Sequence, residues 1–212
     1  SWRPIPLRWR LARYRKATDK PALLAEEVAR NAQVGGKSLV FVQSRRRAEE
    51  LSRYLVANGL HAQHHHAGLP HPERRTVEDS FRNHEIEVLV STSTLEMGLN
   101  LPVRQVVLYD LQAFDGADFR PISTNSVWQR VGRAGRPGLD TEGEAVLLAP
   151  VWDRQAARYE QGAFEAIRSG LADARALAEQ ILVEVASGLA RTPMQLDVTF
   201  GHSLAPDQGI LT

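Results

Sequence analysis

Apolar residues along this chain form short runs that alternate with amphipathic segments, and this pattern predicts a series of strands and helices. Short continuous apolar runs are typical of strands in a parallel sheet that is covered on both faces. Segments that begin at polar caps and end near glycine lie between them and are expected to be helices. The predicted strands cover residues 38–42, 60–65, 87–90, 105–109 and 144–148. The predicted helices cover residues 20–32, 45–58, 70–83 and 126–133.

The alternation of strands and helices predicts an α/β fold with a doubly wound parallel sheet, covering residues 18–151. Residues 1–17 are expected to be an extended lead-in, because Pro4 and Pro6 are incompatible with a helix interior. Residues 152–212 contain no further strand pattern. They are expected to form a separate, partial helical unit, with helices at 153–169 and 171–187 and a third that begins at Thr192-Pro193.

Composition narrows the class of protein. The 212 residues are 43% hydrophobic and 24% charged, as in ordinary globular domains, and no run approaches the roughly 18 apolar residues of a membrane span. We therefore expect no membrane partner. The absence of cysteine excludes disulfides and thiolate chemistry and is a weak indication of a cytoplasmic protein. The net charge of +1 means that any nucleic-acid surface must be a local patch.

Residues 129–136, with the sequence QRVGRAGR, are the strongest chemical signal. Guanidinium groups hold phosphate oxygens in a planar fork, and residues three apart on a helix share one face. Arg133 and Arg136 are therefore expected to reach one polyanion, with the small residues around them allowing a close approach. For two arginines alone, a solvated basic helix would be the commoner explanation.

A second signal lies in residues 91–102, where hydroxyl side chains directly follow a predicted strand and Gly98 follows them. Such a turn suits contact with backbone phosphates. Ser44 also follows a strand, and we expect it to cap the helix at 45–58. A helix N-terminus binds phosphate, but a plain N-cap explains Ser44 equally well.

Three other patterns exclude functions. Gly35-Gly36-Lys37-Ser38 lacks the first glycine of a phosphate loop and lies between a helix and a strand, the reverse of the required order. No Asp-Glu dipeptide occurs, so a DExx magnesium motif is also missing. No metal site is expected at His64-His65-His66, because adjacent strand residues point to opposite faces and no carboxylate is near in sequence.

Residues 91–102 and 129–136 resemble motifs V and VI of superfamily 2 helicases, in the superkiller-like and archaeal repair branch, and residues 41–49 resemble motif IV. The resemblance implies the C-terminal RecA-like domain of such an enzyme. The catalytic residues that it implies are Arg133, Arg136 and Gln129, and the nucleotide-binding residues are Gly98, Asn100 and Gly132. The nucleic-acid-binding residues that it implies are Ser44, Arg45, His66, Thr92, Thr94, Phe114, Phe119 and Arg120.

The same resemblance implies that ATP and Mg are the cofactors, with Mg held mainly by a first RecA-like domain. That domain, in the same protein or a partner, would supply the phosphate loop and DExH motif, so we expect this chain alone to be inactive. The other implied partner is nucleic acid, DNA or RNA. Residues 186–193 look like the start of a winged helix.

Residues 111–122 form a long connection, for which Asp115-Gly116 predicts a hairpin turn flanked by Phe114 and Phe119. In related helicases a hairpin here separates the duplex, whereas an ordinary surface hairpin would pack its phenylalanines on the sheet. Both interpretations stay open. The alternatives for the whole chain are a translocase that does not unwind and a non-catalytic nucleic-acid-binding scaffold. The intact residues of 129–136 argue against the scaffold.

Overall fold

The structure is a computed structural model that describes residues 5–92, 101, 103–114, 116–203 and 205–209. The expectations for Thr94, Gly98 and Asn100 fall outside these residues. The chain divides into two compact units, Ser1–Phe164 and Glu165–Thr212. We describe each unit by itself. No helix in the described residues is long and apolar enough to cross a lipid bilayer.

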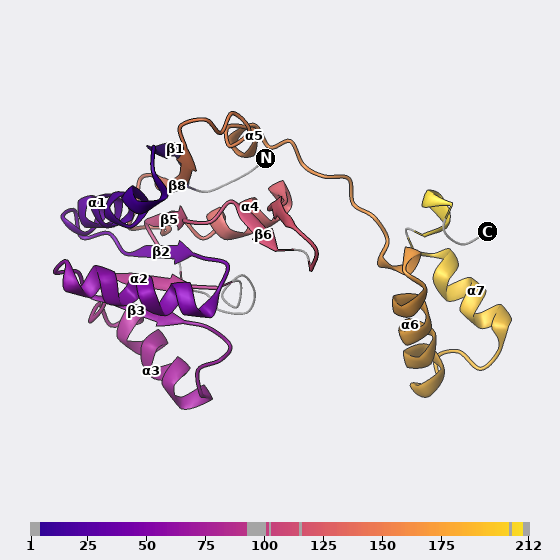
Figure 1. The fold of residues 1–212 in the computed structure, drawn as a ribbon. Helices are drawn as coiled ribbons and strands as arrows, with labels where there is room; N and C mark the ends of the chain where they lie inside the picture. Colours follow the sequence, from indigo (N-terminus) through magenta and orange to yellow (C-terminus); the bar gives the residue numbers. More distant parts are fainter. Residues whose placement is uncertain (1–4, 93–100, 102, 115, 204, 210–212) are drawn as a thin grey trace. The chain divides into compact units, whose positions relative to one another are not determined.

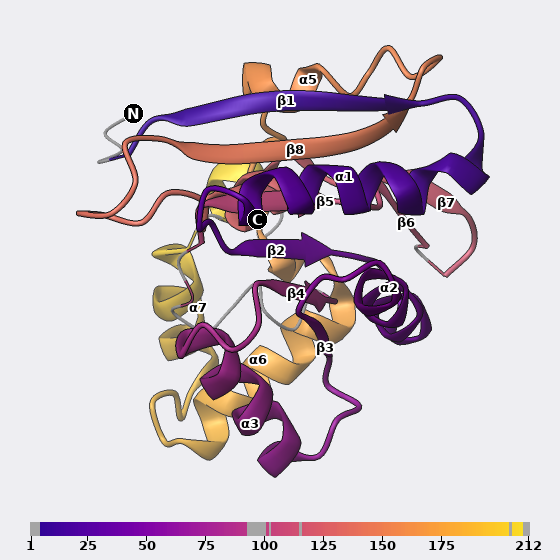
Figure 2. The same cartoon turned by 90° about the vertical axis from the view of Figure 1, so that its left-hand side faces the viewer.

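Unit 1 is built on a six-stranded sheet in which every neighbouring pair is parallel (Figures 1 and 2). The strand order is β1-β8-β5-β2-β4-β3. Its strands are β1 (Leu7–Tyr14), β2 (Ser38–Phe41), β3 (Ala62–His65), β4 (Val88–Ser91), β5 (Gln105–Leu108) and β8 (Gly143–Pro150). The five strands predicted from the sequence are all present. The parallel sheet is thereby confirmed.

The sixth strand, β1, lies in the residues expected to be a lead-in. It pairs with β8 over its whole length, from Leu7 beside Gly143 to Tyr14 beside Pro150. Figure 2 shows these two long strands along one edge of the sheet. The extended conformation was expected from the prolines and the alternating apolar residues. Its place in the sheet was not, because sequence alternation does not identify the partner of an edge strand.

Helices cover both faces of the sheet. On one face α1 (Lys20–Ala32) and α2 (Arg45–Ala57) pack Leu24, Val28 and Leu55 against inward residues of the strands. On the other face α3 (His71–Arg82) and α4 (Thr124–Val131) contribute Phe81 and Val127. The strands in the middle are buried on both sides, which explains their continuous apolar sequence. The doubly wound fold is confirmed.

The segment 35–38 has the element order that argued against a phosphate loop. It connects α1 to β2, with Gly35 in the left-handed region at φ 72°. The Lys37 ammonium is buried and donates to the carbonyls of Phe81 (2.8 Å) and Arg82 (3.3 Å), at the end of α3. A cation at this position stabilises the negative end of the helix dipole. Lys37 therefore has a structural role.

A separate two-stranded hairpin lies between β5 and α4. It consists of β6 (Gln112–Phe114) and β7 (Phe119–Pro121), paired antiparallel. Phe114 is opposite Phe119, so four residues separate the paired positions. The predicted hairpin is confirmed, but the prediction of a two-residue turn is wrong. A four-residue connection satisfies the same register and keeps Gly116 at φ 104°.

The helix expected at 153–169 is wrong, because only the single turn α5 (Arg158–Gln161) forms there. The Asp153 carboxylate accepts from the backbone amides of Gln155 (2.7 Å) and Ala156 (3.1 Å), which stabilises a turn instead. Gly162 then ends α5 in the left-handed conformation, at φ 65°. The compact unit ends at Phe164, thirteen residues beyond the boundary expected at 151.

The described residues of unit 2, 165–203 and 205–209, contain helices joined by loops and no strand. The unit contains α6 (Ala174–Ala186) and α7 (Pro193–Gly201), with short 3-10 turns at Gly170–Ala172 and Pro206–Gln208. Asp173 caps α6, and Thr192 caps α7 by accepting from the Gln195 amide. The helix start at Thr192-Pro193 is confirmed, and the expected helix 171–187 is confirmed with a later start.

Gly135 offers a test of how tightly the QRVGRAGR segment is packed. Gly135 (φ 92°) and Gly138 (φ 78°) both adopt the left-handed conformation, so alanine at either position costs about 1 kcal/mol of backbone strain. A Cβ at Gly135 would lie 2.6 Å from Cγ2 of Ile5, whereas one at Gly138 meets nothing within 4 Å. We predict that Gly135→Ala lowers the free energy of unfolding by about 1–3 kcal/mol more than Gly138→Ala does. Chemical denaturation of the two variants measures the difference, and equal losses would contradict the packing.

Candidate functional site

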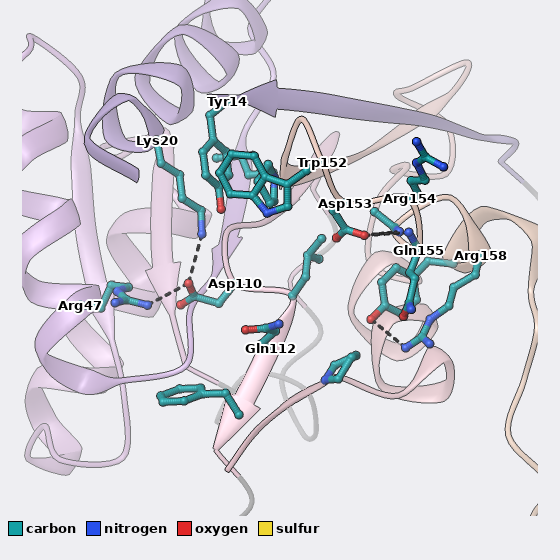
Figure 3. A pocket seen from close by; sticks show the side chains of 17 residues that line it. Tyr14, Lys20, Arg47, Asp110, Gln112, Trp152, Asp153, Arg154, Gln155 and Arg158 are labelled. Carbon is teal, nitrogen blue, oxygen red and sulfur yellow. Dashed lines mark hydrogen bonds and ion pairs between the residues drawn. The ribbon is translucent and has the colours of Figure 1, made fainter. Parts of the chain in front are cut away.

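The carboxyl ends of the six parallel strands meet at one edge of the sheet, and a buried carboxylate lies at its centre. Asp110 lies two residues after the end of β5, and its side chain is 7% exposed. Its Oδ1 accepts from the Arg47 guanidinium (2.8 Å) and the Lys20 ammonium (3.3 Å), and its Oδ2 accepts from the Gln43 backbone amide (3.1 Å). Asp110 therefore joins the ends of β5 and β2 to the first turns of α1 and α2 (Figure 3).

Charge at this cluster is balanced by burial and pairing. Burial lowers the pKa of Lys20, although Asp110 favours its charged form. For Arg47 burial also opposes the charge, but the Asp110 carboxylate outweighs it and raises the pKa. The Lys20 ammonium lies 4.1 Å from the centre of the Tyr109 ring, and burial raises the pKa of Tyr109 to about 12. The Tyr109 hydroxyl is therefore uncharged at neutral pH.

Ser44 and Arg45 lie beside this cluster at the start of α2. Ser44 caps the helix, with its Oγ accepting from the Arg47 amide at 3.2 Å, as the sequence predicted. Both residues are exposed. Gly68 has the Arg45 side chain against it, since a Cβ added at Gly68 would lie 3.1 Å from Arg45 Nη1. The helix N-terminus is thus open to an anion.

His66 is buried and paired. Its Nε2 lies 3.1 Å from Glu49 Oε1, and its Nδ1 accepts from the Gly68 amide at 3.2 Å. Because Nδ1 accepts a hydrogen bond, the proton of the neutral ring is on Nε2, which then donates to Glu49.

Two of the three adjacent histidines, His64 and His66, lie together with a carboxylate, contrary to the expectation from the sequence. His64 and His66 are two apart on the chain, their rings stack at 5.4 Å, and Glu49 lies beside them. These three residues could hold a metal by distance alone. The expectation of no metal site therefore stays a prediction, because a metal ion would displace the proton from Nε2 of His66. Burial lowers the pKa of His64, so that ring favours its neutral form.

Thr92 follows β4 and is half-buried. Its backbone amide donates to the His65 carbonyl (3.3 Å), and its carbonyl accepts from the buried Ser91 hydroxyl (2.8 Å). These bonds fix the strand end beside the His64–His66 segment. Thr94, Gly98 and Asn100 lie outside the described residues.

The QRVGRAGR segment departs from the helix expected for it. The helix α4 ends at Val131 with Gly132 as its C-cap, so Arg133 and Arg136 lie in the loop that follows. The expectation that helical spacing aligns the two arginines is therefore wrong. Gln129 and Gly132 are exposed, and Arg133 and Arg136 are half-buried.

Two backbone contacts hold this loop instead. The Val103 amide donates to the Arg133 carbonyl (3.1 Å), and the Gly135 amide donates to the Val103 carbonyl (2.7 Å). Val103 directly follows the 91–102 segment. The loop that resembles motif VI is therefore hydrogen-bonded to the residue directly after the segment that resembles motif V.

Arg136 is held by Asp140. Its Nε and Nη2 donate to the two carboxylate oxygens at 2.8 Å each, and its backbone amide donates to Oδ2 at 2.8 Å. The hydrogen bond from the Arg136 side chain lowers the pKa of Asp140, and the same bond raises the pKa of Arg136. This bidentate pair fixes the direction of one arginine while Arg133 lies outside it.

Phe114 and Phe119 stand on the hairpin and do not pack on the sheet. They are 59% and 63% exposed, with ring centroids 5.5 Å apart and planes tilted by 55°. Arg120, opposite Ala113, is also exposed. The interpretation in which the phenylalanines pack on the sheet is wrong.

A comparison with protein families identifies the fold. The family described as "Helicase conserved C-terminal domain" matches residues 19–138, more than half of the chain. The chain belongs to this family. The resemblance to superfamily 2 helicases, in their C-terminal RecA-like domain, is thus confirmed, and the six-stranded parallel sheet is that domain.

Curated relatives of this helicase domain are much longer. The ATP-dependent DNA helicase Hel308 of Aeropyrum pernix is 34% identical over 88% of this chain and 32% of its own length. Hel308 of Pyrobaculum calidifontis is 32% identical over 98% of this chain and 36% of its own length. The chain thus spans about a third of the length of these relatives.

Solved structures agree on the fold. The C-terminal domain of the DEAD-box protein Dbp5 is 26% identical, with a TM-score of 0.57, over 74% of this chain and 82% of that one. Dbp5 of S. cerevisiae bound to RNA and ADP BeF3 has a TM-score of 0.60 at 26% identity, over 74% of this chain and 38% of that one.

Sequence reasoning missed three carboxylates of this helicase domain: Asp110, Asp140 and Glu49. Asp110 could have been found, because it directly follows a predicted strand and ligands and polar clusters gather at such strand ends. Asp140 lies four residues after Arg136, a spacing that favours pairing only where the chain turns back. Glu49 is seventeen residues from His66, and nothing local connects them.

Proposed function

We propose that this chain is the C-terminal motor domain of an ATP-dependent DNA helicase, which acts together with an ATP-binding RecA-like domain. One observation carries the proposal. The loop that would contact ATP is held by two backbone hydrogen bonds to Val103, the residue directly after the segment that would contact the strand. This connection is a route by which a change at one segment reaches the other, as a motor requires. The relatives named as DNA helicases support DNA over RNA as the substrate.

On the ATP side, Arg133 and Arg136 stabilise charge on the transferring phosphoryl group, and Gln129 orients the phosphate or the attacking water. Gly132, Gly98 and Asn100 line the nucleotide. The partner domain holds most of the Mg and supplies the phosphate loop, so this chain alone does not hydrolyse ATP. Asp140 gives Arg136 a fixed direction, so that no side-chain entropy is lost when the phosphate arrives.

On the strand side, Ser44 and Arg45 at the start of α2 and the hydroxyls of Thr92 and Thr94 hold backbone phosphates. His66 is buried, so we assign it an indirect role. Its bond to Glu49 positions the turn at Gly68, which lies against the Arg45 side chain. The helices α6 and α7 begin a winged helix that follows the motor domain.

The hairpin distinguishes a helicase from a translocase that does not unwind. Phe114 and Phe119 present two aromatic faces to solvent, and an unpaired base stacks on such a face. Exposed aromatic surface of this kind is a mark of a binding site. We propose that the hairpin with Phe114, Phe119 and Arg120 separates the duplex.

The two arginines should differ in a way that Asp140 reveals. In the enzyme that carries both RecA-like domains, Arg133→Ala should lower kcat for DNA-stimulated ATP hydrolysis by about 10³-fold or more, with DNA affinity nearly unchanged. Arg136→Ala should lower kcat similarly. It should also lower the free energy of unfolding by about 1–3 kcal/mol, because Asp140, whose side chain is 4% exposed, loses both guanidinium hydrogen bonds and keeps only the backbone amide.

Asp140→Asn is the matched control, since it keeps the Arg136 guanidinium and weakens its anchor. It should lower kcat much less than Arg136→Ala does. If the two variants lose the same activity, Arg136 is a structural brace and only Arg133 acts on phosphate.

Replacing both Phe114 and Phe119 by Ala should abolish strand separation while DNA-stimulated ATP hydrolysis continues. The exposed rings contribute little to packing, so the fold should keep its stability. Phe164→Ala, which removes another exposed phenylalanine outside the hairpin, serves as the control. Strand separation and ATP turnover are measured on the same forked duplex. Normal unwinding by the double variant would refute the assignment.

A further inference from the structure

A cavity of about 770 Å³ opens beside the base of the hairpin, over the carboxyl ends of β1, β8 and β5 (Figure 3). Its volume lies within the roughly 300–1,000 Å³ of small-ligand sites. The walls come from the end of β1, the hairpin strands and the segment after β8, all in unit 1. None of the side chains assigned above to ATP lines the cavity. Of the residues assigned to nucleic acid, only Phe119 is among the described lining residues.

The position is where an open α/β sheet offers a crevice. After β2 the chain enters α2 on one face of the sheet, and after the neighbouring β5 it continues to the hairpin and α4 on the other face. Chains that diverge from adjacent strands in this way leave a crevice at their carboxyl ends, and ligands bind there. Asp110 with Lys20 and Arg47 forms its floor.

The lining chemistry fits an unpaired nucleotide. Trp152 is 67% exposed at the cavity, and Tyr14 and Phe119 line it as well. Arg154 is exposed and has no acidic partner within ion-pair distance among the described residues. Aromatic faces stack on bases, and arginine binds phosphate.

Charge at the cavity favours an anion. The charged lining residues are four cations, Lys20, Arg47, Arg154 and Arg158, and two carboxylates, Asp110 and Asp153. Asp110 is neutralised by its two cations, and Asp153 is engaged by two backbone amides. The Arg158 side chain lies over the Tyr159 ring and donates to its hydroxyl at 3.3 Å, and Figure 3 shows it turned away from Arg154. Arg154 is thus the cation left for a phosphate.

We propose that this cavity binds one unpaired nucleotide of the single strand released at the hairpin, with its base against Trp152 and its phosphate at Arg154. The proposal rests on the proposed function, because it takes the hairpin as the point of strand separation. It adds a second strand contact behind the hairpin. A nucleotide held there would oppose re-pairing of the strands.

The test is binding of a short single-stranded oligothymidine to the chain at low salt, where phosphate contacts are strongest. Affinity is measured by anisotropy of a labelled oligonucleotide, and stacking by quenching of tryptophan emission. Wild type should show quenching that Trp152→Phe lacks. Trp152→Ala should bind about 5- to 150-fold more weakly, while Trp152→Phe, which keeps an aromatic face, should retain most of the affinity.

Arg154→Ala should weaken binding and reduce its salt dependence, whereas Arg75→Ala, an exposed arginine on α3 outside the cavity, should not. A blunt duplex should give no quenching, because it offers no unpaired base. If wild type binds the oligonucleotide with unchanged Trp152 emission, and Trp152→Ala binds equally well, the cavity proposal is overturned and the proposed function stands. If wild type binds no single strand at all, both are overturned.

Discussion

The buried carboxylate of Asp110 is the interaction on which the arrangement of this edge depends. A carboxylate so far from water is stable only when it is paired and hydrogen-bonded, and Asp110 has an arginine, a lysine and a backbone amide. These partners belong to three different elements. The bonds therefore fix α1, α2 and the end of β2 relative to β5. The hairpin that follows Asp110 and the helix capped by Ser44 are positioned from the same point.

Backbone hydrogen bonds give a second constraint, at the QRVGRAGR loop. Val103 holds this loop on both sides of Ala134, and Gly135 lies too close to Ile5 for any side chain. The loop is rigid, and its arginines leave the backbone from fixed positions. Preorganised charge is what stabilises a transition state most effectively, because it needs no reorganisation during the reaction. The proposed role on phosphate fits this geometry better than a solvated basic helix does.

Much of the fold could be predicted because parallel strands buried on both faces leave a plain apolar signal. The cap at Ser44 and the start of α7 at Thr192 followed from local chemistry. The place of β1 could not be predicted, since its partner β8 is more than a hundred residues away. The same limit applied to the site. Residue types marked the segments that we propose bind phosphate, but the pairing of His66 with Glu49 and the folding back of Asp140 onto Arg136 depend on turns that spacing alone does not specify.

The most direct test of the account is amide hydrogen exchange of the chain with and without single-stranded DNA. We propose that the DNA strand binds at the carboxyl edge of the sheet. Protection should therefore increase at the start of α2 around Ser44, at Thr92 after β4 and in the hairpin strands β6 and β7. Exchange in α3, which lines neither the hairpin nor the Asp110 cluster, should stay the same. Protection confined to α3 and β3, with none at Ser44 or the hairpin, would contradict the central claim that this edge holds nucleic acid.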